Sequence, residues 1–282
     1  MTGTLKLPEP TWFVGCGNMG GAILDGWRMG GLDLSPVTVI RPSGKPVEGT
    51  RVVTSVVEAG APPKVVVLAF KPQKLDEVAP ELRRFLSAKT SVVSLLAGVE
   101  AASLRERFPA VGAIVRAMTN LPVAVRRGVT GLYSADLGAR EQEELNNLFS
   151  ALGFAIWMAD EQKLAALGSV AGAGPAYVAR FVAALTKAGM KRGLTEEIAA
   201  TLALETVLGT AWMASTRSES MDSIAKRVAS PKGTTEAGLA VLDHDDVLDQ
   251  LVALTIDAAA RRGAELAEEA KSALLADTAR LS

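Results

Sequence analysis

The sequence has one cysteine and one histidine among its 282 residues. A single cysteine cannot form an intramolecular disulfide, and this pair cannot supply a Cys/His metal cage, so we expect a reduced, metal-free cytoplasmic protein. Neither sign of charge is in excess, because 30 Lys and Arg stand against 31 Asp and Glu, a formal net charge of −1. The basic pairs are scattered along the chain, so nucleic acid is not an expected partner.

A long uncharged run is also missing. The longest, Leu164–Ala179, has 16 residues and is broken by three glycines and one proline. A bilayer span needs roughly 20 apolar residues. The first apolar segment starts at Thr11, after Glu9 and Pro10, and lacks the basic start and cleavage site of a signal peptide. We therefore expect no membrane partner.

The apolar fraction is 49%, which is enough to build the cores of two compact domains. From Thr11 to about Met158, short apolar runs alternate with helical stretches, and several of these runs are apolar throughout, as in strands covered on both faces. This rhythm predicts an α/β fold with a mostly parallel, doubly wound sheet. The predicted strands are Trp12–Val14, Val37–Ile40, Arg51–Thr54, Val65–Phe70, Ser91–Leu96, Ala113–Met118 and Phe154–Met158.

After Met158 the pattern is helical. Helices are predicted over Tyr177–Ala188, from near Thr195 with acidic residues in its first turn, and from about Asp246. Roughly 120 Ala-rich helical residues without a sheet need a partner surface, which suggests a homodimer or a higher homo-oligomer. We expect a nucleotide-binding domain over 1–158 and a helical dimerisation and substrate domain over 159–282.

A glycine-rich turn follows the first predicted strand. It reads Gly15-Cys16-Gly17-Asn18-Met19-Gly20 directly after Val14 and opens a predicted helix. The first glycine would permit the tight turn, the second the close approach of a pyrophosphate, and the third close packing of helix against strand. The helix N-terminus would face the anion. These residues are predicted to bind a dinucleotide.

The end of the second predicted strand bears on which dinucleotide is bound. An Asp or Glu there would hold the ribose 2′-hydroxyl of NAD, whereas this chain has Arg41, followed by Ser43 and Lys45. A cation with hydroxyl donors suits a 2′-phosphate, so NADPH is preferred, with NADH as the alternative. Arg41 and Lys45 could instead be solvated loop charges.

Two further segments follow buried strands, at the edge where open α/β sheets bind ligands. Ala69-Phe70-Lys71-Pro72 ends one strand, with Lys71 available to meet phosphate or ribose oxygens or to remain a surface charge. Asn120 follows another and could bind the cofactor or satisfy its own turn.

Several blocks together resemble the pyrroline-5-carboxylate reductase family, in the same order from about residue 11 to 265. The specific ones are Gly172-Ala173-Gly174-Pro175-Ala176-Tyr177 and Ser230-Pro231-Lys232-Gly233-Thr234-Thr235-Glu236-Ala237-Gly238-Leu239. The resemblance implies NAD(P)H-dependent reduction of 1-pyrroline-5-carboxylate to L-proline, the last step of proline biosynthesis. It also implies a Rossmann-type domain followed by an all-helical domain that interlocks two subunits.

The resemblance implies roles for individual residues. Thr235 would stand near the ring nitrogen as the catalytic residue, and Ser230, Gly233 and Thr234 would contact the substrate carboxylate. Ala97 and Asn120 would lie near the nicotinamide, and Glu161 matches a family glutamate that we take as a substrate-site candidate. A turn leading into a helix supplies N–H groups and hydroxyls for a carboxylate without a fixed cation, which agrees with this assignment.

The chain departs from the family pattern at several positions. Ala165, Gly168, Ala173 and Lys232 stand where the family commonly has Asp, Thr, Ser and Gly, and Val56 where it has Asn. Another small cyclic imine is therefore an alternative substrate, and a nucleotide-sensing regulator without catalysis is an alternative from another class. A 3-hydroxyacid dehydrogenase is disfavoured, because Val178 occupies the position of its catalytic lysine.

Overall fold

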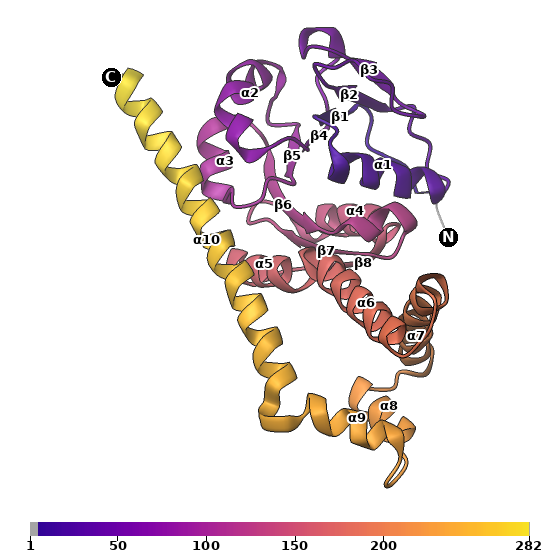
Figure 1. Cartoon of the computed structure of the whole chain (residues 1–282). Coiled ribbons are helices and arrows are strands. Elements are labelled where there is room, and N and C mark those ends of the chain that lie inside the picture. Colours follow the sequence, from indigo (N-terminus) through magenta and orange to yellow (C-terminus); the bar gives the residue numbers. More distant parts are fainter. Residues whose placement is uncertain (1–4, 282) are drawn as a thin grey trace. The chain divides into compact units, whose positions relative to one another are not determined.

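The computed structural model describes residues 5–281, with side chains through 269. The contacts within the chain divide it into two units (Figure 1). The first comprises Met1–Ala173 together with Ala259–Ser282, and the second comprises Gly174–Ala258. The long helix α10 (Val247–Leu281) therefore contributes to both units. The predicted domain boundary lies between residues 158 and 159, whereas the first segment of the first unit continues to Ala173.

The first unit holds an eight-stranded sheet in the order β3-β2-β1-β4-β5-β6-β7-β8. Neighbouring strands are parallel, except that β6 and β7 pair antiparallel. The strands are β1 (Thr11–Val14), β2 (Val37–Ile40), β3 (Arg51–Val53), β4 (Val65–Leu68), β5 (Ser91–Ser94), β6 (Ala113–Thr119), β7 (Gly128–Tyr133) and β8 (Gly153–Trp157).

Helices cover both faces of this sheet (Figure 1). Phe13 of β1 packs in one apolar cluster with Ile23 of α1 (Asn18–Met29) and Leu148 of α4 (Ala139–Ser150). The neighbouring residue Trp12 points into a second cluster with residues of α2 (Leu75–Leu82) and α3 (Ala101–Arg107). Alternate side chains of β1 thus enter opposite cores, which confirms the predicted doubly wound α/β fold.

The seven predicted strands are all present, to within two residues at each end. An eighth, β7, lies in the segment Gly128–Tyr133, which we did not predict as a strand. Two of its six residues are glycines, which weaken a strand signal. Here they serve packing, because a Cβ on Gly131 would lie 2.8 and 2.9 Å from side-chain atoms of Leu167 and Leu164, and one on Gly128 would collide with Val123.

Short helices complete the first unit. Apart from α5 (Glu161–Leu167), they are single 3₁₀ turns or a brief π-helical segment. They are η1 (Val57–Ala59), η2 (Pro72–Lys74), η3 (Arg83–Phe85), η4 (Leu121–Val125) and the π-helix η5 (Gly168–Gly172).

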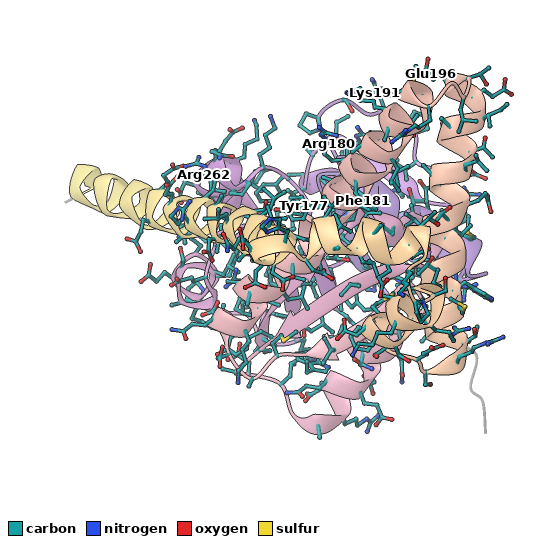
Figure 2. All side chains as sticks on the ribbon, turned by 60° about the horizontal axis from the view of Figure 1, so that its bottom comes forward. Tyr177, Arg180, Phe181, Lys191, Glu196 and Arg262 are labelled. Atoms are coloured by element: carbon teal, nitrogen blue, oxygen red, sulfur yellow. The ribbon has the colours of Figure 1, made fainter. Side chains whose placement is uncertain are left out.

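The second unit is helical, as predicted. It contains α6 (Gly174–Lys191), α7 (Glu196–Arg217), α8 (Met221–Val228), α9 (Thr234–Leu242), η6 (His244–Asp246) and the first part of α10. Figure 2 labels Lys191 and Glu196 where α6 and α7 meet. Small side chains let this pair approach closely, because a Cβ on Gly189 of α6 would lie 3.1 Å from the Cβ of Ala199 of α7.

Large apolar side chains of the second unit remain exposed. On α7, Leu202, Leu208 and Trp212 are 53%, 56% and 56% exposed. By length and composition α7 is also apolar enough to cross a membrane, with 11% of its most apolar window buried. Its sequence nevertheless includes Glu205 near the middle. An isolated chain would leave much of this apolar surface in water.

Candidate active site

The glycine-rich turn after β1 has the geometry that a dinucleotide requires. Gly15 has φ +80°, and a Cβ there would lie 2.7 Å from the main-chain oxygen of Ala69. A Cβ on Gly20 would lie 3.1 Å from the Cβ of Ala69, so this glycine lets α1 pack against the segment after β4. At Gly17 an added Cβ would meet nothing within 4 Å, and the open space leaves the main chain accessible. The tight turn predicted at Gly15 and the close packing predicted at Gly20 are therefore present, and the approach of a pyrophosphate at Gly17 stays a prediction.

The N-terminus of α1 is free to meet an anion. Its N-cap is Gly17, which has no side chain to accept from the first N–H groups, and its first turn contains no acidic residue. The first four N–H groups of a helix lack partners within the helix, and the helix dipole favours negative charge there. These residues fit the pyrophosphate of a dinucleotide.

Arg41 follows β2 in a tight turn. Its main-chain N–H donates to the oxygen of Val53 at 3.0 Å, and its own oxygen accepts from Gly44, which has φ +59°. Burial raises the pKa of the Cys16 thiol, and the positive charge of Arg41 partly opposes this rise. The guanidinium therefore acts electrostatically on the glycine-rich turn, while Ser43 is exposed in the same turn.

The segments after β4 and β5 line the carboxyl edge of the sheet. Ala69 donates from its main chain to Val14 at 2.8 Å, while Lys71 is exposed and extended before Pro72 starts η2. A pocket of about 150 Å³ lies on this edge. Its lining includes Pro72, Gln73, Ala97, Val99 and Arg107, with Leu266 from the part of α10 that belongs to the first unit.

Asn120, just after β6, is buried, and its amide is engaged with the main chain. Its Oδ1 accepts from the N–H of Val129 at 2.9 Å, and its Nδ2 donates to the oxygen of Ala171 at 2.9 Å. The side chain thus ties the end of β6 to β7 and to η5. These bonds leave one amide proton and further oxygen lone pairs for a ligand.

Glu161, the first residue of α5, forms two hydrogen bonds through one oxygen. Its Oε1 accepts from Nη1 of Arg116 on β6 at 2.6 Å and from the main-chain N–H of Ala101 at 2.9 Å. The Arg116 side chain is 8% exposed and that of Glu161 is 28% exposed. One oxygen of the carboxylate is therefore bonded inside the first unit.

The Ser230–Thr235 segment lies in the second unit and leads into α9. Gly233 is the N-cap of α9, and a Cβ there would collide with the hydroxyl of Ser230. Thr234 and Thr235 are the first two helical residues, and their N–H groups are at the open end of the helix. Glu236 turns its carboxylate back to the N–H of Lys232, at 2.6 Å. The predicted turn before a helix is present as expected.

Comparisons with known proteins cover nearly the whole chain. A pyrroline-5-carboxylate reductase dimerisation family matches residues 161–266, and the family described as NADP oxidoreductase, coenzyme F420-dependent, matches residues 12–98. The pyrroline-5-carboxylate reductase of Pseudomonas aeruginosa is 38% identical over 91% of this chain and 96% of that protein. The chain belongs to the pyrroline-5-carboxylate reductase family. The predicted family resemblance is thereby confirmed.

Solved structures agree with this membership. A pyrroline-5-carboxylate reductase from Coxiella burnetii is 31% identical, with a TM-score of 0.83 over 92% of this chain and 99% of that one. The Plasmodium falciparum enzyme, solved with NADP bound, is 24% identical with a TM-score of 0.83, covering 94% of this chain and 100% of that chain, and shares the fold. The Rossmann-type domain and the helical dimerisation region are thus those of the reductase family.

At two positions where the chain departs from the reductase pattern, Lys232 and Gly168, the backbone conformation or a neighbouring side chain bears on the departure. Lys232 has φ +59°, in the left-handed region that glycine adopts without strain. Gly168 faces Met118, and a Cβ there would lie 3.1 Å from the Met118 methyl group. The Met118 side chain therefore occupies the space that a larger residue at 168 would need.

Sequence reasoning on the reductase motifs did not single out Arg116 as a functional residue. It stands in β6, whose other buried residues are apolar or threonine, and it is itself buried. The signal in the sequence is an arginine within an apolar strand, because a buried guanidinium needs an acidic partner. The identity of that partner required the structure, because Glu161 is 45 residues further along the chain.

Proposed function

We propose that this chain reduces 1-pyrroline-5-carboxylate to L-proline with NADPH. The observation that carries the proposal is the presence in one chain of an open glycine-rich turn beside Arg41 and of the Ser230–Thr235 segment at the start of α9. The first suits a phosphorylated dinucleotide, and the second suits a carboxylate beside a ring nitrogen. Membership of the reductase family supports the same reaction.

The proposed roles follow the chemistry of the groups. NADPH, when bound, supplies the hydride that reduces the imine carbon. Ser230, Gly233 and Thr234 hold the substrate carboxylate, and the Thr235 hydroxyl orients the ring nitrogen. Because the imine can arrive protonated, the chain needs no strong general acid, and its work is to position the ring and exclude water.

The apolar faces of the helical unit support a homodimer or a higher homo-oligomer. The half-exposed leucines and Trp212 of α7 would be covered by a second copy, in agreement with the dimerisation family that matches this region. The apolar character of α7 is then an interface property, so the proposal includes no membrane and no nucleic acid as partner. The proposed compartment is the cytoplasm, and the partner in catalysis is a small molecule.

A panel of cyclic imines, followed by NADPH absorbance, tests the reaction itself. Oxidation of NADPH with 1-pyrroline-5-carboxylate and formation of L-proline are expected. Preference for a different cyclic imine would replace the substrate, and NADPH binding without oxidation by any imine would indicate a nucleotide-sensing protein instead.

Thr235→Val tests the chemical step. Loss of one hydrogen bond to the reacting ring should cost on the order of 1 to 3 kcal/mol, or roughly ten- to a hundredfold in kcat/KM, with kcat also lowered. Ser230→Ala should mainly raise KM, because a carboxylate contact is equal in ground and transition states. NADPH affinity should be unchanged in both variants, and wild-type kcat/KM in Thr235→Val would contradict the assignment.

A further inference from the structure

The carboxylate of Glu161 joins three parts of the first unit that are far apart in the sequence. Its Oε1 accepts from Ala101 at the start of α3 and from Arg116 in β6, while Glu161 itself begins α5. The α5 N-terminus does not need this side chain, because Asp160 already caps it by accepting from the N–H of Lys163 at 2.7 Å. Glu161 therefore serves contacts outside its own helix.

The bond to Ala101 fixes the far end of a loop on the carboxyl edge of the sheet. This loop runs from β5 to α3 and includes Ala97, Gly98 with φ +76° and the buried Val99. At its near end, the N–H of Leu95 donates to the oxygen of Leu68 at 3.0 Å, continuing the sheet. The loop is thus held at one end by the sheet and at the other by the Glu161 carboxylate.

This loop faces the same pocket as the segment after β4. Ala97 and Val99 line the pocket together with Pro72 and Gln73. A shift of Ala101 would therefore move the pocket wall that Ala97 and Val99 form. Arg116 adds stiffness, because a buried guanidinium bonded at 2.6 Å keeps the carboxylate in one place.

We propose that Glu161 is a positioning residue for the cofactor, acting through Ala101 and the 95–100 loop, and not a substrate contact. Arg116 holds the Glu161 carboxylate in place. The inference rests on the proposed use of NADPH. It differs from the expectation drawn from the sequence, in which Glu161 is a substrate residue, because its bond to Ala101 holds the 95–100 loop and its bond to Arg116 fixes the carboxylate against β6.

The isosteric variant Glu161→Gln separates positioning from substrate binding. It retains an oxygen that can accept from Ala101 but removes the charge that balances Arg116. The dissociation constant for NADPH, measured on the whole protein by fluorescence titration without substrate, should rise on the order of tenfold. At saturating NADPH, kcat should fall while KM for the imine stays within about twofold. A raised KM with unchanged NADPH affinity would overturn the proposal in favour of substrate contact.

Asp160→Ala is the matched control. It removes the cap of α5 one residue away, without touching Arg116 or Ala101, so it should lower thermal stability while leaving NADPH affinity unchanged. Equal losses of NADPH affinity in Asp160→Ala and Glu161→Gln would show that Glu161 has only a general structural role and would overturn the inference.

Arg116→Met keeps the test valid if Glu161→Gln folds poorly, because it removes the other partner and should by itself weaken NADPH binding. Where both single variants fold, the double variant should bind NADPH no worse than the weaker single variant, because the two residues act as one unit. Additive losses would contradict the proposed link. NADPH binding by the wild-type protein separates this outcome from a failure of the proposed reaction, since binding can be measured without turnover.

Discussion

Arg41 occupies the position after β2 where a carboxylate would hold a ribose hydroxyl. It is half-buried, and its charge acts on the Cys16 thiol in the glycine-rich turn. Lys45, four residues on, is exposed, and the hydroxyl of Ser43 accepts from its main-chain N–H at 3.4 Å. The two cations of this loop therefore differ in how closely they are linked to the cofactor turn.

Arg41→Asp should reverse the cofactor preference. A charged hydrogen bond to a 2′-phosphate contributes about 1.5 to 3 kcal/mol, so KM for NADPH should rise roughly ten- to a hundredfold while KM for NADH changes little or falls. Lys45→Asp, which makes the same change of charge at an exposed position, should have a much smaller effect. Steady-state kinetics with both nucleotides provides the measurement, and equal effects of Arg41→Asp on the two would refute the 2′-phosphate role.

The glycine-rich turn shows which properties of single residues can be predicted from the sequence. The turn at Gly15 and the packing at Gly20 follow from spacing alone, because local geometry dictates them. The partners of Glu161 and Asn120 did not follow, because each bonds to residues brought close only by the fold. Contacts between distant segments depend on strand order and register, which periodicity leaves open.

At the scale of elements, the turn before α9 contains a strained position. Lys232 has φ +59°, where a non-glycine residue is disfavoured, yet its N–H still donates to Glu236. By contrast, Lys226 lies in the last turn of α8 and is exposed. Lys232 and Lys226 therefore allow the same substitution to be compared at a strained and at a regular helical position.

Lys232→Gly should stabilise the protein. Relief of the left-handed conformation, worth about 1 to 2 kcal/mol, exceeds the entropy that glycine adds to the unfolded chain, so the free energy of unfolding should rise by about 0.5 to 1 kcal/mol. Lys226→Gly should instead lower it by about 1 kcal/mol. Urea unfolding at one fixed protein concentration measures both, and destabilisation by Lys232→Gly would show that the lysine side chain makes a contact worth more than the strain.

Strand β7 marks the limit of prediction at this scale. Strands β1, β2, β4, β5 and β6 are largely apolar runs buried between helices, and their residue types alone identify them. In β7 the two glycines make room for Val123 and for the leucines of α5, so the packing that stabilises the strand also removes its sequence signal.

At the scale of the whole molecule, the two units differ in how they bury apolar surface. The central strands of the first unit are covered on both faces, whereas α7 in the second leaves Leu208 more than half exposed. Sequence composition predicted this division into α/β and helical parts. It did not predict that the end of α10 belongs with the first unit, since a continuous helix carries no boundary in its periodicity.

Light scattering should give a mass of at least twice 29.4 kDa at micromolar concentration. Leu208→Asp places a charge on the apolar face of α7 and should shift the population toward monomers. Val57→Asp, at a position of the first unit that is 69% exposed, should leave the mass unchanged. A wild-type monomer that is active would refute the oligomer, and an unaltered mass in Leu208→Asp would place the interface elsewhere.

The four tryptophans are divided between the units in a way that makes the protein its own optical probe. Trp12 and Trp27 lie in the two cores of the first unit and Trp157 is half-buried there, whereas Trp212 belongs to the second and is 56% exposed. Indole emission moves to shorter wavelength as water is excluded. Subunit association that covers α7 would therefore appear as a blue shift on raising the concentration, and Trp212→Phe would remove that shift while keeping the emission of the nucleotide-binding half.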